Sequence, residues 1–248
     1  MGTYDPKGYA KAKRVDAVQF TEAEPPAHLS SVVHRFVELK TIGTLDEDYR
    51  FHALPDACTY IVFNQLDPRV TGVTTLRAKS EELNLGRNFH FVNIRFLPGV
   101  CHFNHEQSGY GQVDASYDGD LPLLDVSQRL MGRSFEVKQL IMSELVEHLM
   151  ATKKVVPNAV TQKIFRNLED INTVSDMAAS SELSPRQLQR TLKRTTGFAP
   201  HDFLKVLRLQ QALSNASTDN YADQSHFIHS FRKATGYTPG RYAKEFDV

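Results

Sequence analysis

Short apolar runs rich in β-branched and aromatic residues dominate the chain between Val32 and Val113. Turn-forming stretches such as Asp67-Pro and Leu97-Pro-Gly separate these runs, which is typical of strands rather than helices. The predicted strands are VVHRFV from Val32, TYIVF from Thr59, VTGVTT from Val70 and FHFVNIRF from Phe89. We therefore expect a mostly β N-terminal domain over residues 1–120.

The strand that begins at Phe89 alternates in a way that predicts two different faces. Phe91 and Arg95 fall on one side, and Val92 and Ile94 fall on the other, because successive side chains of a strand point in opposite directions. We expect one face to meet a core and the other to meet a cavity or a partner strand.

The period of the apolar positions becomes helical from Ser134 to Ala151. One stripe is wider than a single core contact requires; it consists of Val137, Leu140, Ile141, Leu145 and Leu149, widened by Met142, Val146 and Met150. Packing on the β domain is one interpretation, and pairing with a second subunit is the other. Lys153, Lys154 and Pro157 then end the helix, so residues 121–156 are predicted to be a helical connector.

A short helix, a turn and a second helix are predicted between Thr173 and Gly197. Thr173 or Asn172 can cap the first helix, and Ser184 can cap the second by accepting from its free N–H groups. Pro185 suits the first helical position, where no N–H is needed, and Gly197 ends the helix.

The second of these helices is expected to present a basic surface. Leu188 and Leu192 lie four residues apart and are predicted to face inward, towards Met177, Ala178 and Leu183. The opposite side then holds Arg186, Gln187, Gln189, Arg190, Lys193 and Arg194. Arg and Gln side chains match guanine and adenine edges in the major groove, whereas Lys suits phosphate. A solvated surface is the alternative interpretation of such a basic face.

Length and charge place this motif in its own domain. At 248 residues, with 41% hydrophobic and 23% charged residues, the chain is long enough for two globular domains. The whole chain has no net charge, but residues 158–248 carry twelve basic and nine acidic side chains, a net of +3. That asymmetry is compatible with a polyanionic partner and is weak evidence alone.

Neither a signal peptide nor a membrane-spanning run is present in the sequence, and there are only two cysteines, Cys58 and Cys101. We therefore expect a soluble, cytoplasmic protein without a membrane partner.

Nearly all of residues 158–246 resembles the AraC/XylS family of transcription regulators. The matching residues are Ala178, Leu183 to Arg190, Gly197 to Pro200, Arg208 to Ala212, Tyr221 to Phe227, Phe231-Arg232 and Gly236 to Pro239. The resemblance implies an all-α domain over residues 157–248, with two helix-turn-helix units that enter successive major grooves of double-stranded DNA. It implies a linker helix at about Pro200 to Leu213. It also places Arg186, Gln189 and Arg190 at base-contacting positions.

The second helix-turn-helix unit departs from the family pattern. Only eight residues separate Ala212 from Tyr221, where the family has room for a loop and a whole helix. At about 1.5 Å rise per residue, eight residues cannot form both, so the second scaffold helix is predicted to be missing. Residues from Asp223 to Lys233 still form a helical pattern. Its reader positions are Gln224, Ser225 and His229.

The N-terminal half resembles, more loosely, a sensory module that precedes such domains. The segments that carry this resemblance are LPDACTYIVF from Leu54, Gly72 and IRFLPG from Ile94. The resemblance implies sensing of a small-molecule effector or a partner. Tyr60, Phe63, Phe91 and Arg95 are the candidates to line a pocket, with core packing as the alternative role for each.

Metal binding and catalysis have less support. Cys101-His-Phe-Asn-His105 holds metal-ligating side chains, but at no established zinc spacing. No phosphate-binding loop or catalytic motif occurs, so no metal, cofactor or enzymatic activity is predicted.

The sequence therefore predicts an α+β protein: a β-rich sensory domain followed by an α-helical reader whose second unit is shortened. The expected function is sequence-specific transcription regulation in response to an effector or partner, with a homodimer as one assembly. The alternative is a protein-interaction module that modulates another regulator after its DNA reading has weakened.

Overall fold

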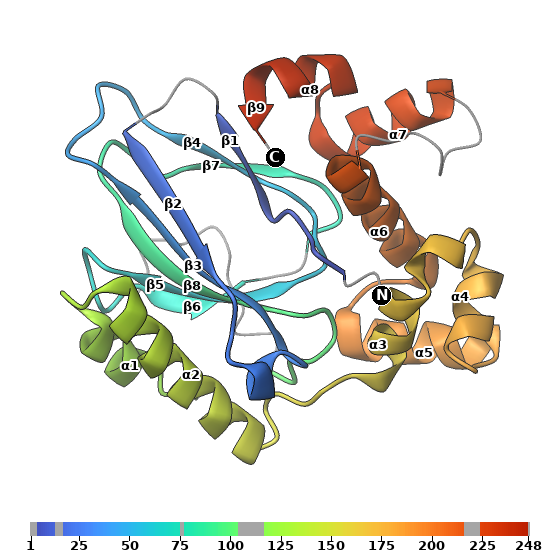
Figure 1. Cartoon of the computed structure of the whole chain (residues 1–248), viewed down its shortest axis with the longest axis horizontal. Helices are drawn as coiled ribbons and strands as arrows, with labels where there is room; N and C mark the ends of the chain where they lie inside the picture. The colour runs from blue at the N-terminus through green and yellow to red at the C-terminus, as the bar shows by residue number, and fades with distance from the viewer. Residues whose placement is uncertain (1–3, 13–16, 75–76, 104–116, 216–223, 248) are drawn as a thin grey trace.

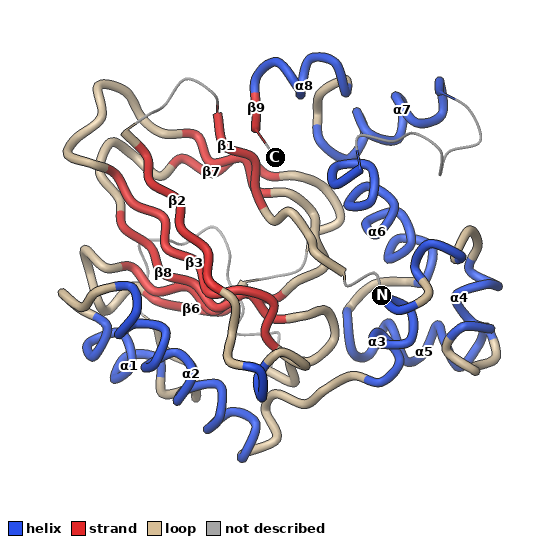
Figure 2. The backbone as a smooth tube through the Cα atoms, viewed as in Figure 1, coloured by secondary structure: helices blue, strands red, loops and turns tan. Residues whose placement is uncertain are grey.

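The computed structural model describes residues 4–12, 17–74, 77–103, 117–215 and 224–247. Two β-sheets make up most of the N-terminal half, and helices make up the C-terminal half (Figures 1 and 2). This confirms the predicted α+β class, with a β-rich region followed by a helical one.

The strands form a five-stranded sheet in the order β2-β3-β8-β5-β6 and a four-stranded sheet in the order β7-β4-β1-β9. Every strand pairing within the described residues is antiparallel. The strands are β1 Tyr9–Ala12, β2 Val18–Ala23, β3 Val33–Thr41, β4 Arg50–Ala53, β5 Thr59–Asn64, β6 Thr71–Val73, β7 Glu81–Asn84, β8 His90–Phe96 and β9 Phe246–Asp247. The four runs predicted as strands became β3, β5, β6 and β8. The less apolar strands β1, β2, β4 and β7 were missed.

The helices are α1 Leu123–Leu130, α2 Phe135–Ala151, α3 Ala159–Arg166, α4 Val174–Ser180, α5 Pro185–Thr196, α6 Pro200–Asn215, α7 Gln224–Thr235 and α8 Pro239–Glu245. Short 3-10 turns lie at Ala27–Leu29 and Leu168–Asp170. No described helix has both the length and the apolar composition that a membrane span requires.

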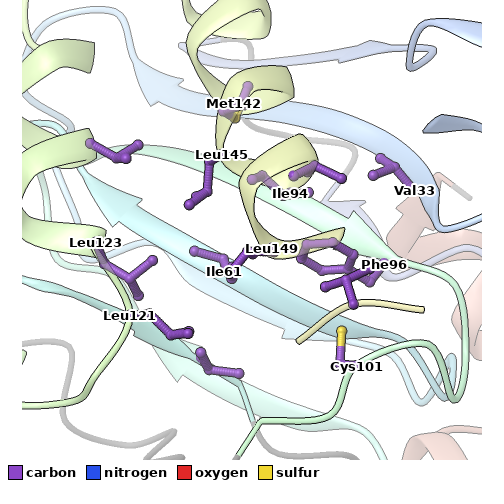
Figure 3. Packing of buried hydrophobic residues seen from close by; sticks show 14 of the residues in the cluster. Val33, Ile61, Ile94, Phe96, Cys101, Leu121, Leu123, Met142, Leu145 and Leu149 are labelled. Carbon is purple, nitrogen blue, oxygen red and sulfur yellow. The ribbon is translucent and has the colours of Figure 1, made fainter. Parts of the chain in front are cut away.

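The main core lies between the five-stranded sheet and helices α1 and α2, which cover one of its faces (Figure 1). Figure 3 shows Met142, Leu145 and Leu149 of α2 directed towards Ile61 and Ile94 of the sheet. The predicted helix from Ser134 therefore packs on the β domain, as the first of its two interpretations required.

A buried ionic cluster also fastens α2 to this sheet. The Nζ atom of Lys138 donates to Oε1 of Glu38 at 2.6 Å, and His90 lies 3.0 Å from the same oxygen. Burial alone would raise the pKa of Glu38, but the hydrogen bonds from His90, Lys138 and Lys40 outweigh it and hold the pKa well below its usual range. The cluster is therefore charged, as a buried ion pair must be to offset its desolvation.

The segment that follows α2 contacts the β domain. Val155 is buried and forms an isolated β-bridge with Cys101, and the backbone N–H of Val156 donates to the carbonyl of Val100. The residues that follow Lys153 and Lys154 therefore pack on the β domain through Val155, whereas the side chain of Val156 is exposed. The domain boundaries at residues 120 and 156 themselves remain a prediction.

Candidate nucleic-acid interface

Two capped helices build the first helix-turn-helix unit. Thr173 caps α4 by accepting from the N–H of Asp176 at 3.1 Å, and the carboxylate of Asp176 accepts from the N–H of Thr173 at 2.7 Å. Ser184 and Gln187 form the same reciprocal arrangement at the start of α5. Such capping boxes satisfy N–H groups that the helix leaves free, so the local sequence alone sets where both helices begin.

The end of α5 also follows the prediction. Gly197 adopts a left-handed conformation with φ 72°, which a residue without a side chain reaches at little cost. The ammonium of Lys193 donates to the Gly197 carbonyl at 3.2 Å and so compensates the negative end of the helix.

The residues that α5 buries determine which of its residues face outward. Leu188 and Leu192 have no exposed surface and pack in one cluster with Met177 and Ala178 of α4. Arg186, Gln187, Gln189, Arg190, Lys193 and Arg194 are all exposed and together line one shallow surface depression. The packing of two leucines therefore brings every α5 residue that we predicted for DNA contact to the same side of the molecule.

The residues of this surface differ in their freedom to bind a partner. Gln187 uses its amide oxygen in the cap of α5, and Lys193 is engaged at the C-terminus of the helix. Within the part of the chain that the structure describes, Arg186, Arg190 and Arg194 make no ion pair. Together with the ammonium of Lys193, these three guanidinium groups carry the positive charge that the surface offers.

The second unit contributes α7, whose aromatic residues face inward. Phe227 and Phe231 lie with ring centroids 5.6 Å apart and pack in one cluster with Leu209 and Ala212 of α6. Helix α7 therefore packs its aromatic residues on the linker helix α6. His229 is exposed. The side chains of Gln224 and Ser225, predicted as readers, lie outside the described residues.

A cavity between the two sheets matches the predicted sensory site in part. It is lined by apolar and aromatic residues, with Asn93 and Arg95 among its polar ones, and about 50 Å³ of it is open to the centres of water molecules. Tyr60, Phe91 and Arg95 border it. Phe63 does not, because it points to the opposite face of β5 and is fully buried in the main core. The strand alternation that put Tyr60 on the cavity face had to put Phe63 on the other.

The polar end of the cavity is built around Arg95, which is 2% exposed. Its guanidinium donates to Glu22 at 2.8 Å and to the carbonyl of Pro6 at 3.1 Å. Its Nε atom and the Oδ1 atom of Asn93 are buried and have no hydrogen-bond partner among the described residues. Unpartnered buried polar atoms are costly, so this end of the cavity is suited to a ligand or water that would pair with them.

Tyr60, which borders the cavity, pairs with Asp56 close to Arg95. The Tyr60 hydroxyl donates to Asp56, and burial raises the pKa of both groups. Gly8 lies so close to them that a Cβ atom would stand 2.8 Å from the Asp56 carboxylate and closer still to the Tyr60 hydroxyl. A glycine is therefore required where the N-terminal segment passes this cluster. Neither Gly8 nor Asp56 was predicted as a site residue, because neither has a local sequence signature.

The alternative chemistry gains no support from the site geometry. Both Cys58 and Cys101 are buried with free thiols, and burial raises the pKa of each, which opposes the reactive thiolate form. No group of three or more metal-ligating side chains occurs among the described residues, and His105 lies outside them.

Residues 177–245 match the family described as a helix-turn-helix domain, and this match spans α5, α6 and α7. The C-terminal part of the chain is an AraC-type helix-turn-helix domain. This AraC-type domain supports a DNA-binding transcription regulator. Residues 21–107 match a domain of unknown function, DUF6597.

Two solved structures of ToxT from Vibrio cholerae are similar to most of the chain. One has 11% sequence identity and a TM-score of 0.41, and the alignment covers 94% of this chain and 100% of that one. The other, from Vibrio cholerae O395, has 10% identity and a TM-score of 0.41, with 92% and 97% of the two chains covered. No curated protein matches the sequence.

Proposed function

We propose that the protein is a sequence-specific regulator whose α5 helix reads bases in the major groove. The observation that carries this proposal is the single exposed surface of α5, where Arg186, Gln189 and Arg190 follow one another at helical spacing without an acidic partner. Arg can form two hydrogen bonds with the edge of a guanine, and Gln can form two with the edge of an adenine. A surface that bound only phosphate would not need side chains with this paired geometry.

The test is selection of bound sites from random double-stranded DNA, followed by titration of the selected operator. Arg190→Ala is expected to weaken binding to that operator by about 1 to 3 kcal/mol and to relax the base preference at one position. Arg133→Ala, the same change at an exposed site outside the helical domain, is the matched control and should bind as the wild type does.

Two outcomes would contradict base reading. An equal loss of affinity on all DNA sequences would mean that Arg190 contacts only phosphate. The titration is carried out at two stated salt concentrations, because phosphate contacts weaken steeply with salt. If no motif emerges at physiological salt, the alternative of a protein-interaction module takes precedence.

We also propose that the cavity between the sheets binds a small effector. Its lining supports a compact ligand with an apolar body, which would contact Phe20, Phe51 and Phe91, and a polar end able to pair with Asn93 and Arg95. Pockets of this mixed character are typical of small-molecule sites. The space is small, so a ligand larger than a few water molecules would have to displace side chains.

Two copies of the chain are proposed to pair through the outer side of α2. Leu140 is 64% exposed and Val137 is 40% exposed on this helix, even though its other side is fully packed. A dimer would place two AraC-type domains on one DNA molecule, which raises the effective affinity without any new contact to bases.

A further inference from the structure

The second helix-turn-helix unit borders the N-terminal domain at Leu54, the residue that directly follows β4. Leu54 is 1% exposed, and the apolar cluster that buries it belongs otherwise to the C-terminal part of the chain. Its neighbours there include Leu209 of α6, Phe231 of α7 and Tyr242 of α8. A side chain of the β domain thus lies in the core of the second DNA-reading unit.

His52 of β4 adds a second contact to the same unit. It is 4% exposed, and its Nδ1 atom lies 3.3 Å from the hydroxyl of Tyr242. Its ring stacks on Phe246 at a centroid distance of 5.0 Å and meets the edge of Tyr237 at 5.6 Å. Three aromatic rings from the end of the chain therefore surround one histidine of the β domain.

Backbone hydrogen bonds join the two parts as well. The N–H of Ser80 donates to the carbonyl of Ala234, near the end of α7, at 2.7 Å. Strand β9 pairs with β1, which pairs with β4 on its other side, so the end of the chain completes the four-stranded sheet (Figure 1). The second unit is thus continuous with the N-terminal sheet.

The first unit is built differently, because it has its own scaffold. Helix α4 supplies Met177 and Ala178 to the inward face of α5. In the second unit no described helix takes that place, since α6 ends at Asn215 and α7 begins at Gln224. The residues between them, 216–223, lie outside the described part of the chain, and so does the predicted loss of the second scaffold helix.

We propose that the end of β4 acts as a scaffold for the second unit, and that His52 and Leu54 are positioning residues for DNA reading by α7. The proposal rests on the function proposed above. It also places α7 one strand away from the effector cavity, because β4 alternates: Phe51 and Ala53 line the cavity, whereas His52 and Leu54 contact the second unit.

The test compares Leu54→Ala with Leu121→Ala in the full chain. Both leucines are buried in the N-terminal half, but Leu121 lies in the main core, away from the second unit. Amide hydrogen exchange is expected to be at least about tenfold faster in α7 and α8 of Leu54→Ala, with α5 unchanged. Leu121→Ala should leave the ratio between α7 and α5 as in the wild type.

A DNA-binding measurement distinguishes a positioning role from a merely structural one. Arg190→Ala identifies the half of the selected operator read by α5, and the other half is then scrambled. The wild type should bind the intact operator at least about tenfold more tightly than the scrambled one, and Leu54→Ala should lose this preference. His52→Ala is the second variant, in case Leu54→Ala fails to fold, and should act in the same direction.

Each contrary outcome has a definite meaning. Unchanged exchange in α7 of both Leu54→Ala and His52→Ala, or equal acceleration in α5 and α7, would overturn the scaffold role. Retention of the preference for the intact operator in both variants would overturn the positioning role. If the wild type selects no operator at all, the proposed function fails, whereas the exchange measurement still decides whether β4 holds the second unit.

Discussion

Asn93 illustrates how a single residue can be unfavourable for folding and useful for binding. Its Oδ1 atom is buried beside the cavity without a hydrogen-bond partner among the described residues, while its neighbour across the sheet is Val62. A buried acceptor that has lost water and gained no partner destabilises the fold. Polar groups of this kind are commonly retained where a ligand supplies the missing partner.

We predict that the single substitution Asn93→Leu stabilises the protein. The free energy of unfolding should rise by about 1 kcal/mol, since the substitution removes an unsatisfied acceptor and adds apolar surface to the cavity. Urea denaturation measures the change, and any effector found for the wild type should lose affinity for the variant.

The control is Val62→Leu, which adds volume to the same cavity without changing its polarity. An equal gain in stability from Val62→Leu would mean that filling space, rather than removing the acceptor, explains the result. A loss of stability in Asn93→Leu would contradict the idea that Asn93 is unpaired.

Among the elements, strand β4 has two sides that contact different parts of the molecule. One side of this strand lines the cavity, and the other side carries His52 against the aromatic residues of the chain end. Burial lowers the pKa of His52, although the backbone of Thr235 and the charge of Glu82 act in the opposite direction. The folded protein therefore holds this imidazole in its neutral form near neutral pH.

This leads to a pH-dependent prediction. The unfolded chain binds a proton at His52 as the pH falls through about 6.5, whereas the folded protein does so only at lower pH, so acidification from about 7.5 to 5.5 destabilises the fold. His52→Phe preserves the ring contacts and should reduce that loss by a few tenths to about 1 kcal/mol. Urea denaturation at the two pH values measures it.

His102→Phe is the matched control, because His102 is exposed. The same acid sensitivity in His52→Phe as in the wild type would show that other groups account for the loss. His34 is the first to consider, since burial lowers its pKa too.

At the scale of the whole molecule, the outer side of α2 is an apolar surface, with Leu140 64% and Val137 40% exposed. Leu140→Glu is predicted to convert a dimer into a monomer, because a charge at the centre of an apolar interface would be buried without a partner. Sedimentation velocity measures the change. Leu66→Glu, at a residue 52% exposed in the β5–β6 turn, should remain a dimer. A monomeric wild type, or a dimeric Leu140→Glu, would exclude this surface.

The helix-turn-helix unit at α4 and α5 was predictable from the sequence because its causes are local. Ser184, Pro185 and Gly197 act within one turn of their own position, and Leu188 and Leu192 orient the helix by their spacing alone. The same local reasoning identified strands β5 and β8 and the two faces of β8. Their apolar alternation is visible in the residues themselves.

Only the tertiary structure decided how the N-terminal sheet meets the second reading unit. The pairing of β1 with β9 joins residues from opposite ends of the chain. The burial of Leu54 among helices, and of His52 among aromatic rings, depends on partners more than 150 positions away along the chain. Phe63 lies opposite to its predicted place because the side of the sheet covered by α2 is chosen by packing. Periodicity within a strand defines two faces, but only the elements that assemble against it determine which face becomes core and which becomes cavity.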